Sequence, residues 1–206
     1  MLIALVMPTH SRVIAQSYDE NHIDLARYFI PKMEMWCKAN GWRHIVRHVN
    51  SDDHYHDHNY RKYPLVRELI CDHDVVVWAD TDVIPVSWKD FIMPDGDIHF
   101  SWDRHGLCAG FVAYRSCQWT ADFVAGLTAI IPQRGLHRTH EQDCLKAITM
   151  VGDCGYHIRM LPETIVSNPQ SPRLNTPPTF FHAWSNSGVY DAIKRAEDIC
   201  NYITDS

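Results

Sequence analysis

The chain has 206 residues, of which 46% are hydrophobic and 21% are charged, and its formal net charge is -6. This length and composition predict one substantial hydrophobic core, and we interpret residues 1–206 as a single domain. The acidic balance, without a long block of Lys or Arg, argues against nucleic acid or an anionic membrane surface as a partner.

The N-terminus lacks the features of a signal peptide, because the apolar run from Leu2 to Met7 is short and reaches Pro8 at once. No later apolar run approaches the ~18 residues that a membrane-spanning helix needs. The seven cysteines include no C-x-x-C pair, which indicates reduced thiols rather than a disulfide framework or a zinc ribbon. We therefore expect a soluble, cytoplasmic protein.

The first 80 residues alternate between strand and helix patterns. Apolar residues repeat at helical spacing over residues 18–39, and Asn40-Gly41 supplies a stop signal for that helix. Residues 75–79 are a continuous run of β-formers, as expected for a central strand that helices cover on both faces. This alternation predicts a parallel nucleotide-binding unit over residues 1–83. The other elements expected here are strands at 2–7 and 44–49, a polar loop at 9–12 and a helix at 60–71.

The second half of the chain, residues 84–206, has a less regular pattern. A loop rich in Pro, Ser and Asn over residues 167–179 precedes the segment Phe180-Phe181-His182. The elements predicted in this half are strands at 98–102, 110–114 and 156–161 and helices at 119–131, 141–150 and 190–202.

Two carboxylates follow the predicted third strand directly, Asp80 and Asp82, with only Thr81 between them. Open α/β folds bind their ligands at the carboxyl ends of strands, so both side chains belong to that edge of the sheet. At this spacing the carboxylates can converge on one hard cation and bring it to a diphosphate. The pattern therefore predicts a metal centre, with a plain acidic surface turn as the alternative for so short a motif.

A histidine far along the chain is a candidate third ligand. His182 follows two phenylalanines, and an imidazole nitrogen there can complete the coordination of a cation held by the acidic pair. The alternative is a core histidine that bonds to the backbone.

Three further segments, read together with the acidic pair, resemble a known group. These segments are residues 59–69 (NYRKYPLVREL), residues 110–119 (GFVAYRSCQW) and the later Glu141-Gln142-Asp143. In order and spacing, over about residues 55–185, the chain is similar to the galactosyl- and xylosyltransferase family of the GT-A fold. That family includes yeast galactosyl- and mannosyltransferases and plant xyloglucan xylosyltransferases.

The resemblance implies an α/β protein of the GT-A fold, with a mixed central sheet and helices on both faces. It also implies a glycosyltransferase that uses Mn²⁺ or Mg²⁺ and a nucleotide sugar, UDP-linked by preference, with a glycan or glycoprotein as acceptor. Residues 84–206 would then form the acceptor side and complete the metal site. The implied metal ligands are Asp80, Asp82 and His182, with Asp80 also near the donor. The implied nucleotide-facing loop holds Thr9, His10 and Arg12, and Arg61 or Lys62 would reach the diphosphate, with ordinary surface charge as the alternative.

The chain departs from the family in two respects. Eukaryotic members typically have an N-terminal membrane helix, whereas this sequence begins with the short run described above. It also has Cys108-Ala109-Gly110 where the family often has Asn before its glycine-containing strand. A small viral or bacterial relative working in cytosol would account for both differences.

The reaction course stays open at this point. The family is similar to retaining transferases, in which the leaving phosphate helps to deprotonate the acceptor hydroxyl. An inverting relative would instead need a carboxylate as general base, and Asp103 and Asp143 are the candidates. Either could equally be a structural cap or turn residue, since acidic side chains favour helix N-termini.

Other interpretations compete with this one. His54, His56 and His58 alternate and could hold zinc on one face of a strand, although their acidic neighbours favour a solvated loop. An apolar strand followed by D-x-D also opens the aspartyl-phosphate phosphohydrolases, which usually place it on their first strand. A third alternative is a nucleotide-sugar binding module without turnover.

Overall fold

The computed structural model of the chain describes residues 11–50, 60, 62–103, 106–133, 145–146, 154–171, 176–184 and 188–204. The strand predicted over residues 2–7 lies outside this part of the chain. The first described strand is β1 (Arg12–Tyr18), which is followed by a short 3₁₀ helix, η1 (Glu20–His22).

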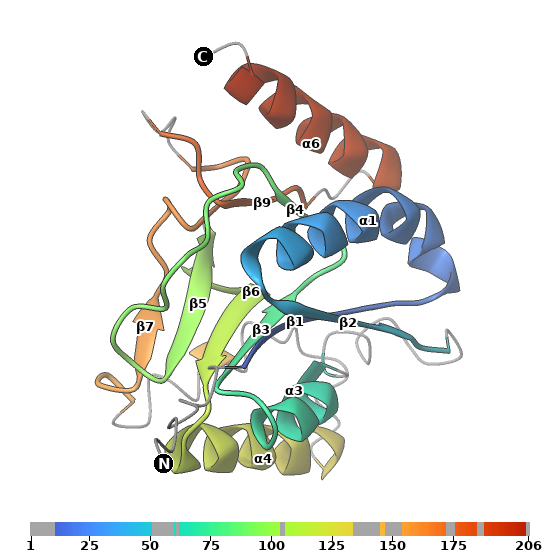
Figure 1. The fold of residues 1–206 in the computed structure, drawn as a ribbon. Coiled ribbons are helices and arrows are strands. Elements are labelled where there is room, and N and C mark those ends of the chain that lie inside the picture. The colour runs from blue at the N-terminus through green and yellow to red at the C-terminus, as the bar shows by residue number, and fades with distance from the viewer. Residues whose placement is uncertain are drawn as a thin grey trace, which may run out of the picture.

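A mixed six-stranded sheet forms the centre of the molecule (Figure 1), built from β1, β2 (Arg43–His48), β3 (Val75–Ala79), β5 (Ile98–Asp103), β6 (Gly106–Arg115) and β7 (Ile158–Met160). The strand order is β2-β1-β3-β6-β5-β7. β1 is parallel to both β2 and β3, whereas β6 is antiparallel to both β3 and β5. This arrangement confirms the predicted mixed central sheet.

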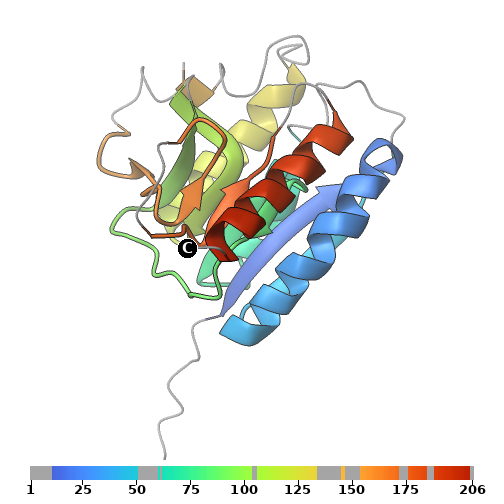
Figure 2. The ribbon, with the colours of Figure 1, turned by 90° about the horizontal axis from the view of Figure 1, so that it is seen from above.

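Helices and a second sheet cover the two faces of the central sheet (Figures 1 and 2). α3 (Lys62–Ile70) and α4 (Gln118–Gln133) lie on one face. α1 (Ile23–Asn40) lies on the other, next to a three-stranded sheet of β4 (Val83–Pro85), β9 (Phe180–His182) and β8 (Val166–Ser167). α6 (Val189–Thr204) packs beside α1, as the view from above shows.

β3 is the strand that joins the two halves of the core. Its side chains alternate between the faces, so that Val76 and Trp78 pack toward α3 while Val77 and Ala79 pack toward α1. All four are buried, and each valine contributes about 1.5–3 kcal/mol through burial. As the sequence predicted, this continuous apolar run is a strand that is covered on both faces.

The start of the first βα unit differs from the prediction. We expected a polar loop at 9–12 and a helix from residue 18, but Tyr18 ends β1 and α1 begins at Ile23. Val13, Ile14 and Ala15 are fully buried, so they belong to a central strand. The sequence did not indicate this strand because its apolar run is short. The predicted helix stop is confirmed, because Gly41 adopts φ 69° and its amide caps Cys37.

Most other elements agree with their predicted ranges to within a few residues. Pro64 occupies the first turn of α3, where a missing amide hydrogen costs nothing. The helix predicted at 141–150 falls almost entirely outside the described residues. In the part of the chain that the structure describes, every helix is too short or too polar to cross a bilayer.

Candidate active site

The turn between β3 and β4 holds both aspartates of the motif, and three hydrogen bonds hold it in place, two of them to β1. The amide of Val83 donates to the carbonyl oxygen of Asp80 at 3.0 Å, which closes the turn. The buried side chain of Gln16 in β1 donates to the same carbonyl at 3.1 Å. Thr81 Oγ1 donates to the carbonyl oxygen of Ser17 at 2.7 Å. Because this backbone is anchored, the two carboxylates leave it in defined directions.

The carboxylate of Asp80 is held by two side chains beneath it. Trp78 Nε1 donates to Asp80 Oδ1 at 2.7 Å, and Lys62 Nζ lies 3.7 Å from the same oxygen. The Lys62 side chain is only 2% exposed and donates to the carbonyl oxygen of Ala109 at 2.9 Å. A buried ammonium group needs such partners. Lys62 therefore links the acidic turn to β6, while Asp80 stays 38% exposed.

A bulge in β6 brings its backbone to the acidic turn. The register between β5 and β6 shifts at Phe100 and Ser101, which leaves residues 109–111 as extra residues on β6. Within this bulge, the carbonyl oxygen of Gly110 accepts a hydrogen bond from the Asp80 amide at 2.7 Å. Bulges of this kind often re-aim groups near binding sites.

The pairing of β4 with β9 places His182 beside the second aspartate. Val83 lies opposite His182 in the ladder, and the amide of Ala183 donates to the carbonyl oxygen of Asp82 at 3.0 Å. His182 Nε2 then lies 3.2 Å from Asp82 Oδ1. The His182 side chain is 7% exposed and that of Asp82 is 18% exposed, so this pair is largely removed from solvent.

The two groups strongly perturb each other's protonation. Burial by itself lowers the pKa of His182, but the Asp82 carboxylate and the Cys108 sulfur outweigh it and raise the pKa well above the ordinary value. Burial by itself raises the pKa of Asp82, and the charge and hydrogen bond of His182 reverse this and lower it. Without a metal, the pair is an imidazolium–carboxylate ion pair at neutral pH.

Asp80, Asp82 and His182 converge on one point. One ligand atom from each of the three lies within 4.8 Å of the other two. Carboxylate oxygens suit hard cations such as Mg²⁺ and Mn²⁺, and an added imidazole shifts the preference toward Mn²⁺. These residues thus fit a divalent cation and would leave coordination positions for oxygens of a bound ligand.

Several solved structures are similar to this chain. A glycosyltransferase involved in glycosylation of the major capsid of PBCV-1 superposes with a TM-score of 0.67 and 12% identity, covering 92% of this chain and 98% of its own. The galactosyltransferase LgtC, solved with donor and acceptor sugar analogs, superposes with a TM-score of 0.59 and 13% identity, covering 93% of this chain and 96% of its own. Mouse xyloside xylosyltransferase 1 superposes with a TM-score of 0.52 and 10% identity, covering 87% of this chain and 99% of its own.

The chain has the GT-A fold. This confirms the fold that the resemblance implied. No protein-family model matches the sequence, and no curated protein is significantly similar to it.

Within this GT-A fold, Asp103 lies at the same sheet edge as the acidic turn. Asp103 is the last residue of β5, and β5 runs parallel to β3 because both are antiparallel to β6. The carboxyl ends of the two strands therefore point the same way. Asp103 is 7% exposed, so its carboxylate is largely buried at that edge.

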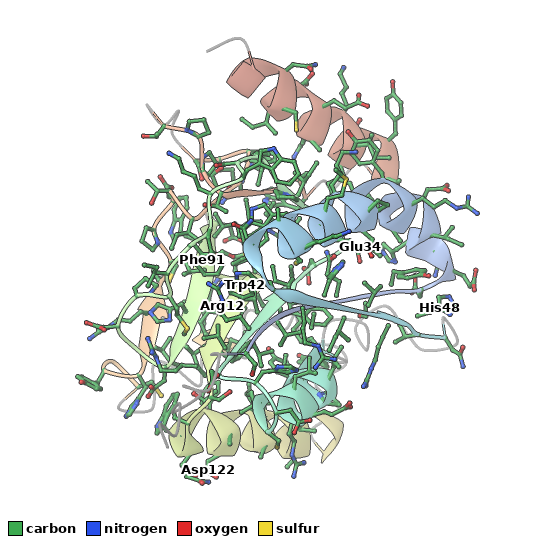
Figure 3. The ribbon with its side chains drawn as sticks, in the orientation of Figure 1. Arg12, Glu34, Trp42, His48, Phe91 and Asp122 are labelled. Atoms are coloured by element: carbon green, nitrogen blue, oxygen red, sulfur yellow. The ribbon has the colours of Figure 1, made fainter. Side chains whose placement is uncertain are left out.

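Arg12 is not brought to the site. It begins β1 and lies opposite Val75, the first residue of β3, whereas Asp80 follows the last residue of β3. There its guanidinium bonds to Asp90 at 2.7 Å and lies 4.7 Å from the centre of the Trp42 ring (Figure 3). Arg12 thus anchors the far edge of the sheet, and the expectation that it faces the nucleotide does not fit this position.

The remaining predicted site residues lie outside the described part of the chain. Their roles remain predictions, as does metal binding by the alternating histidine cluster. These residues are Thr9, His10, Arg61 and Asp143 at the site, and His54, His56 and His58 in the cluster.

The sequence analysis missed the segment that follows β1. Asp19 is 1% exposed, and its Oδ1 accepts from the amides of Asn21 and His22 and contacts His22 Nδ1 at 2.7 Å. Ser17, two residues before Asp19, accepts a hydrogen bond from Thr81 Oγ1 at 2.7 Å, so this segment leaves β1 next to the acidic turn. A helix-capping Asp after the run Val13–Ala15 was the available signal.

A partly buried histidine behind the turn predicts a specific loss of stability in acid. His44 Nε2 bonds to Gln16 Oε1 at 2.9 Å, and burial lowers the pKa of His44 from 6.5 to about 4. Below pH 6.5 the unfolded chain takes up a proton that the folded chain excludes, so stability falls between pH 6.5 and 4. The difference between the two pKa values corresponds to about 3 kcal/mol in the free energy of unfolding. Urea unfolding at several pH values should show a flatter decline for His44→Gln than for wild type, and identical declines would contradict this assignment.

Proposed function

We propose that this chain is a metal-dependent glycosyltransferase that moves a hexose, deoxyhexose or pentose from a nucleotide-diphosphate sugar to a glycan or glycoprotein. The observation that carries the proposal is the convergence of Asp80, Asp82 and His182 within 4.8 Å at the edge of a GT-A sheet. A UDP-linked sugar with Mn²⁺ is the first donor to test, and Mg²⁺ is the alternative cation. Residues 1–206 would form one catalytic domain.

In this function the three residues would hold the cation, which supplies positive charge to the diphosphate as the sugar departs. His182 presents Nε2 to the site, and that nitrogen would have to lose its proton to act as a ligand. Lys62 keeps the Asp80 carboxylate in place from below. Asp19 and His22 border the site on the β1 side, where the donor nucleotide would lie.

We assign Asp103 to the acceptor side. Its carboxylate lies at the carboxyl end of β5, two strands from the acidic turn in the same sheet. In an inverting reaction a carboxylate here would take the proton of the acceptor hydroxyl, and in a retaining reaction it would orient that hydroxyl. Asp143 is the second candidate for this role. The anomeric configuration of the product, read by NMR, distinguishes the two courses.

The phosphohydrolase alternative fits the structure less well. In that class the first aspartate of the motif is a nucleophile and needs an open approach for a phosphate monoester. Here Asp80 Oδ1 already accepts from Trp78 and faces Lys62, and the motif follows the third strand. Phosphate release from simple monoesters would favour the rival. Binding of a nucleotide sugar without hydrolysis or transfer to any acceptor would favour a binding module.

A thermal-shift screen tests the proposal. A donor present at 100 times its dissociation constant stabilises the folded state by ~2.7 kcal/mol, which raises the melting temperature by roughly 5–10 °C. We expect this rise only when the nucleotide sugar and Mn²⁺ are present together. Mn²⁺ alone, the sugar nucleotide with EDTA, and a sugar monophosphate with Mn²⁺ are the controls. A panel of nucleotide sugars that leaves the melting temperature unchanged would overturn the proposal.

A further inference from the structure

Two residues of β6, Cys108 and Gly110, lie against the imidazole of His182. Cys108 Sγ lies 3.7 Å from His182 Nδ1, while Nε2 on the other side of the ring lies 3.2 Å from Asp82 Oδ1. Cys108 is 4% exposed, so its sulfur has little access to water as an alternative partner. The ring is thus held between a thiol and a carboxylate, one at each nitrogen.

Gly110 meets the edge of the same ring. A Cβ added at Gly110 would collide with His182 Cε1 and would lie 2.7 Å from Nε2 and 2.8 Å from Nδ1. All three separations are below the 3.0 Å under which something must shift. Gly110 is not among the glycines with positive φ, so its backbone would tolerate alanine. The position therefore requires glycine for space and not for conformation.

From these contacts we infer that Cys108 and Gly110 are positioning residues for His182. Gly110 leaves the volume that the ring occupies, and Cys108 accepts a hydrogen bond from Nδ1–H. With Nδ1–H bonded to Cys108, Nε2 is the nitrogen that faces Asp82 and the point where the three ligand atoms converge, and it would supply the ligand lone pair once a bound cation displaces its proton. The role of these two residues in metal binding rests on the proposed function, whereas the contacts themselves are those of the metal-free protein.

The two residues act on different properties of the ring. Loss of the Cys108 contact removes the hydrogen bond that orients the ring, whereas a side chain at 110 displaces the whole ring. Removing a partner behind a metal-bound histidine typically weakens metal affinity by about 10–100-fold. Misplacement of a group by ~1 Å in an active site can lower the reaction rate by about 100-fold. Gly110→Ala is therefore expected to have the larger effect.

A double-mutant cycle tests the steric part without any metal. Gly110→Ala should lower the melting temperature of the metal-free protein by roughly 5 °C, because the added methyl overpacks a buried ring. The same change in a His182→Ala background should cost much less, since the ring is gone. Gly126→Ala on α4, where nothing lies within 4 Å of an added Cβ, is the matched control and should not lower the melting temperature. Equal losses in both backgrounds would overturn the role of Gly110.

The hydrogen bond from His182 Nδ1–H to Cys108 is tested by spectroscopy and by metal titration. Long-range ¹H–¹⁵N spectra of the metal-free protein should show changed His182 ring signals in Cys108→Ala and near-native signals in Cys108→Ser, whose hydroxyl still accepts. Mn²⁺ titration followed by electron paramagnetic resonance should show about tenfold weaker binding for Cys108→Ala. Cys37→Ala removes another buried thiol and should change neither readout. Native His182 signals and native Mn²⁺ affinity in Cys108→Ala would overturn the role of Cys108.

The outcomes separate this inference from the proposed function. Wild-type protein that binds no Mn²⁺ would end the proposed metal centre, while the cycle and the ring spectra of the metal-free protein would still decide how His182 is positioned. Wild-type affinity in Gly110→Ala, with the proposed centre intact, would overturn only the inference.

Discussion

Asp82→Asn is expected to abolish the manganese dependence of nucleotide-sugar binding. The substitution keeps the size of the side chain but removes the negative charge that faces His182 Nε2 at 3.2 Å, so the cation loses one of its charged ligands. A loss of several kcal/mol of charge stabilisation corresponds to a decrease of about 1,000-fold in transfer rate. Calorimetry of a nucleotide sugar with and without Mn²⁺ measures the binding effect, and product formation measures the rate.

A matched control separates this effect from a general change in charge. Asp122 is an exposed residue of α4, on the opposite face of the central sheet from β4 and β9 (Figure 3). Asp122→Asn should therefore leave binding and transfer unchanged. If Asp82→Asn retained the wild-type affinity both with and without Mn²⁺, the acidic turn would not be the metal centre.

The central strand and its acidic turn could be predicted because all their information is local. β3 is a continuous apolar run of five residues, four of them buried, and a buried strand has to deliver its last residues to a sheet edge. The same local logic located the glycine that ends α1. Neither feature needs any knowledge of which distant segments pack nearby.

The start of the first βα unit could not be placed in the same way. Val13–Ala15 is too short an apolar run to stand out, and its burial comes from helices and strands far along the chain. Because the start of this unit was misplaced, Arg12 was assigned to the expected nucleotide-facing loop. The true first loop, with Asp19 and His22, was overlooked as a result.

The approach of His182 to the acidic turn depends on pairing between distant segments. The β4–β9 ladder joins residues about a hundred positions apart, and no local pattern indicated that pairing, although His182 itself was a candidate ligand in the sequence. The β6 bulge left no mark in the pattern of residues either, because a bulge changes register without changing composition. Contacts of this kind arise from the assembled sheet.

Lys62→Met is expected to produce the largest loss of stability among the variants proposed. Methionine fills a similar volume, but it leaves the Ala109 carbonyl and the Asp80 carboxylate without the ammonium group that lies 2.9 and 3.7 Å from them. Breaking a buried charged contact of this kind costs about 3 kcal/mol, or roughly 10 °C in melting temperature. Lys38→Met, at an exposed position in the last turn of α1, is the control and should change little. Because Asp80 would also lose its support, Mn²⁺ affinity should fall together with stability. Equal melting temperatures for the two variants would show that the contacts of Lys62 do not stabilise the fold.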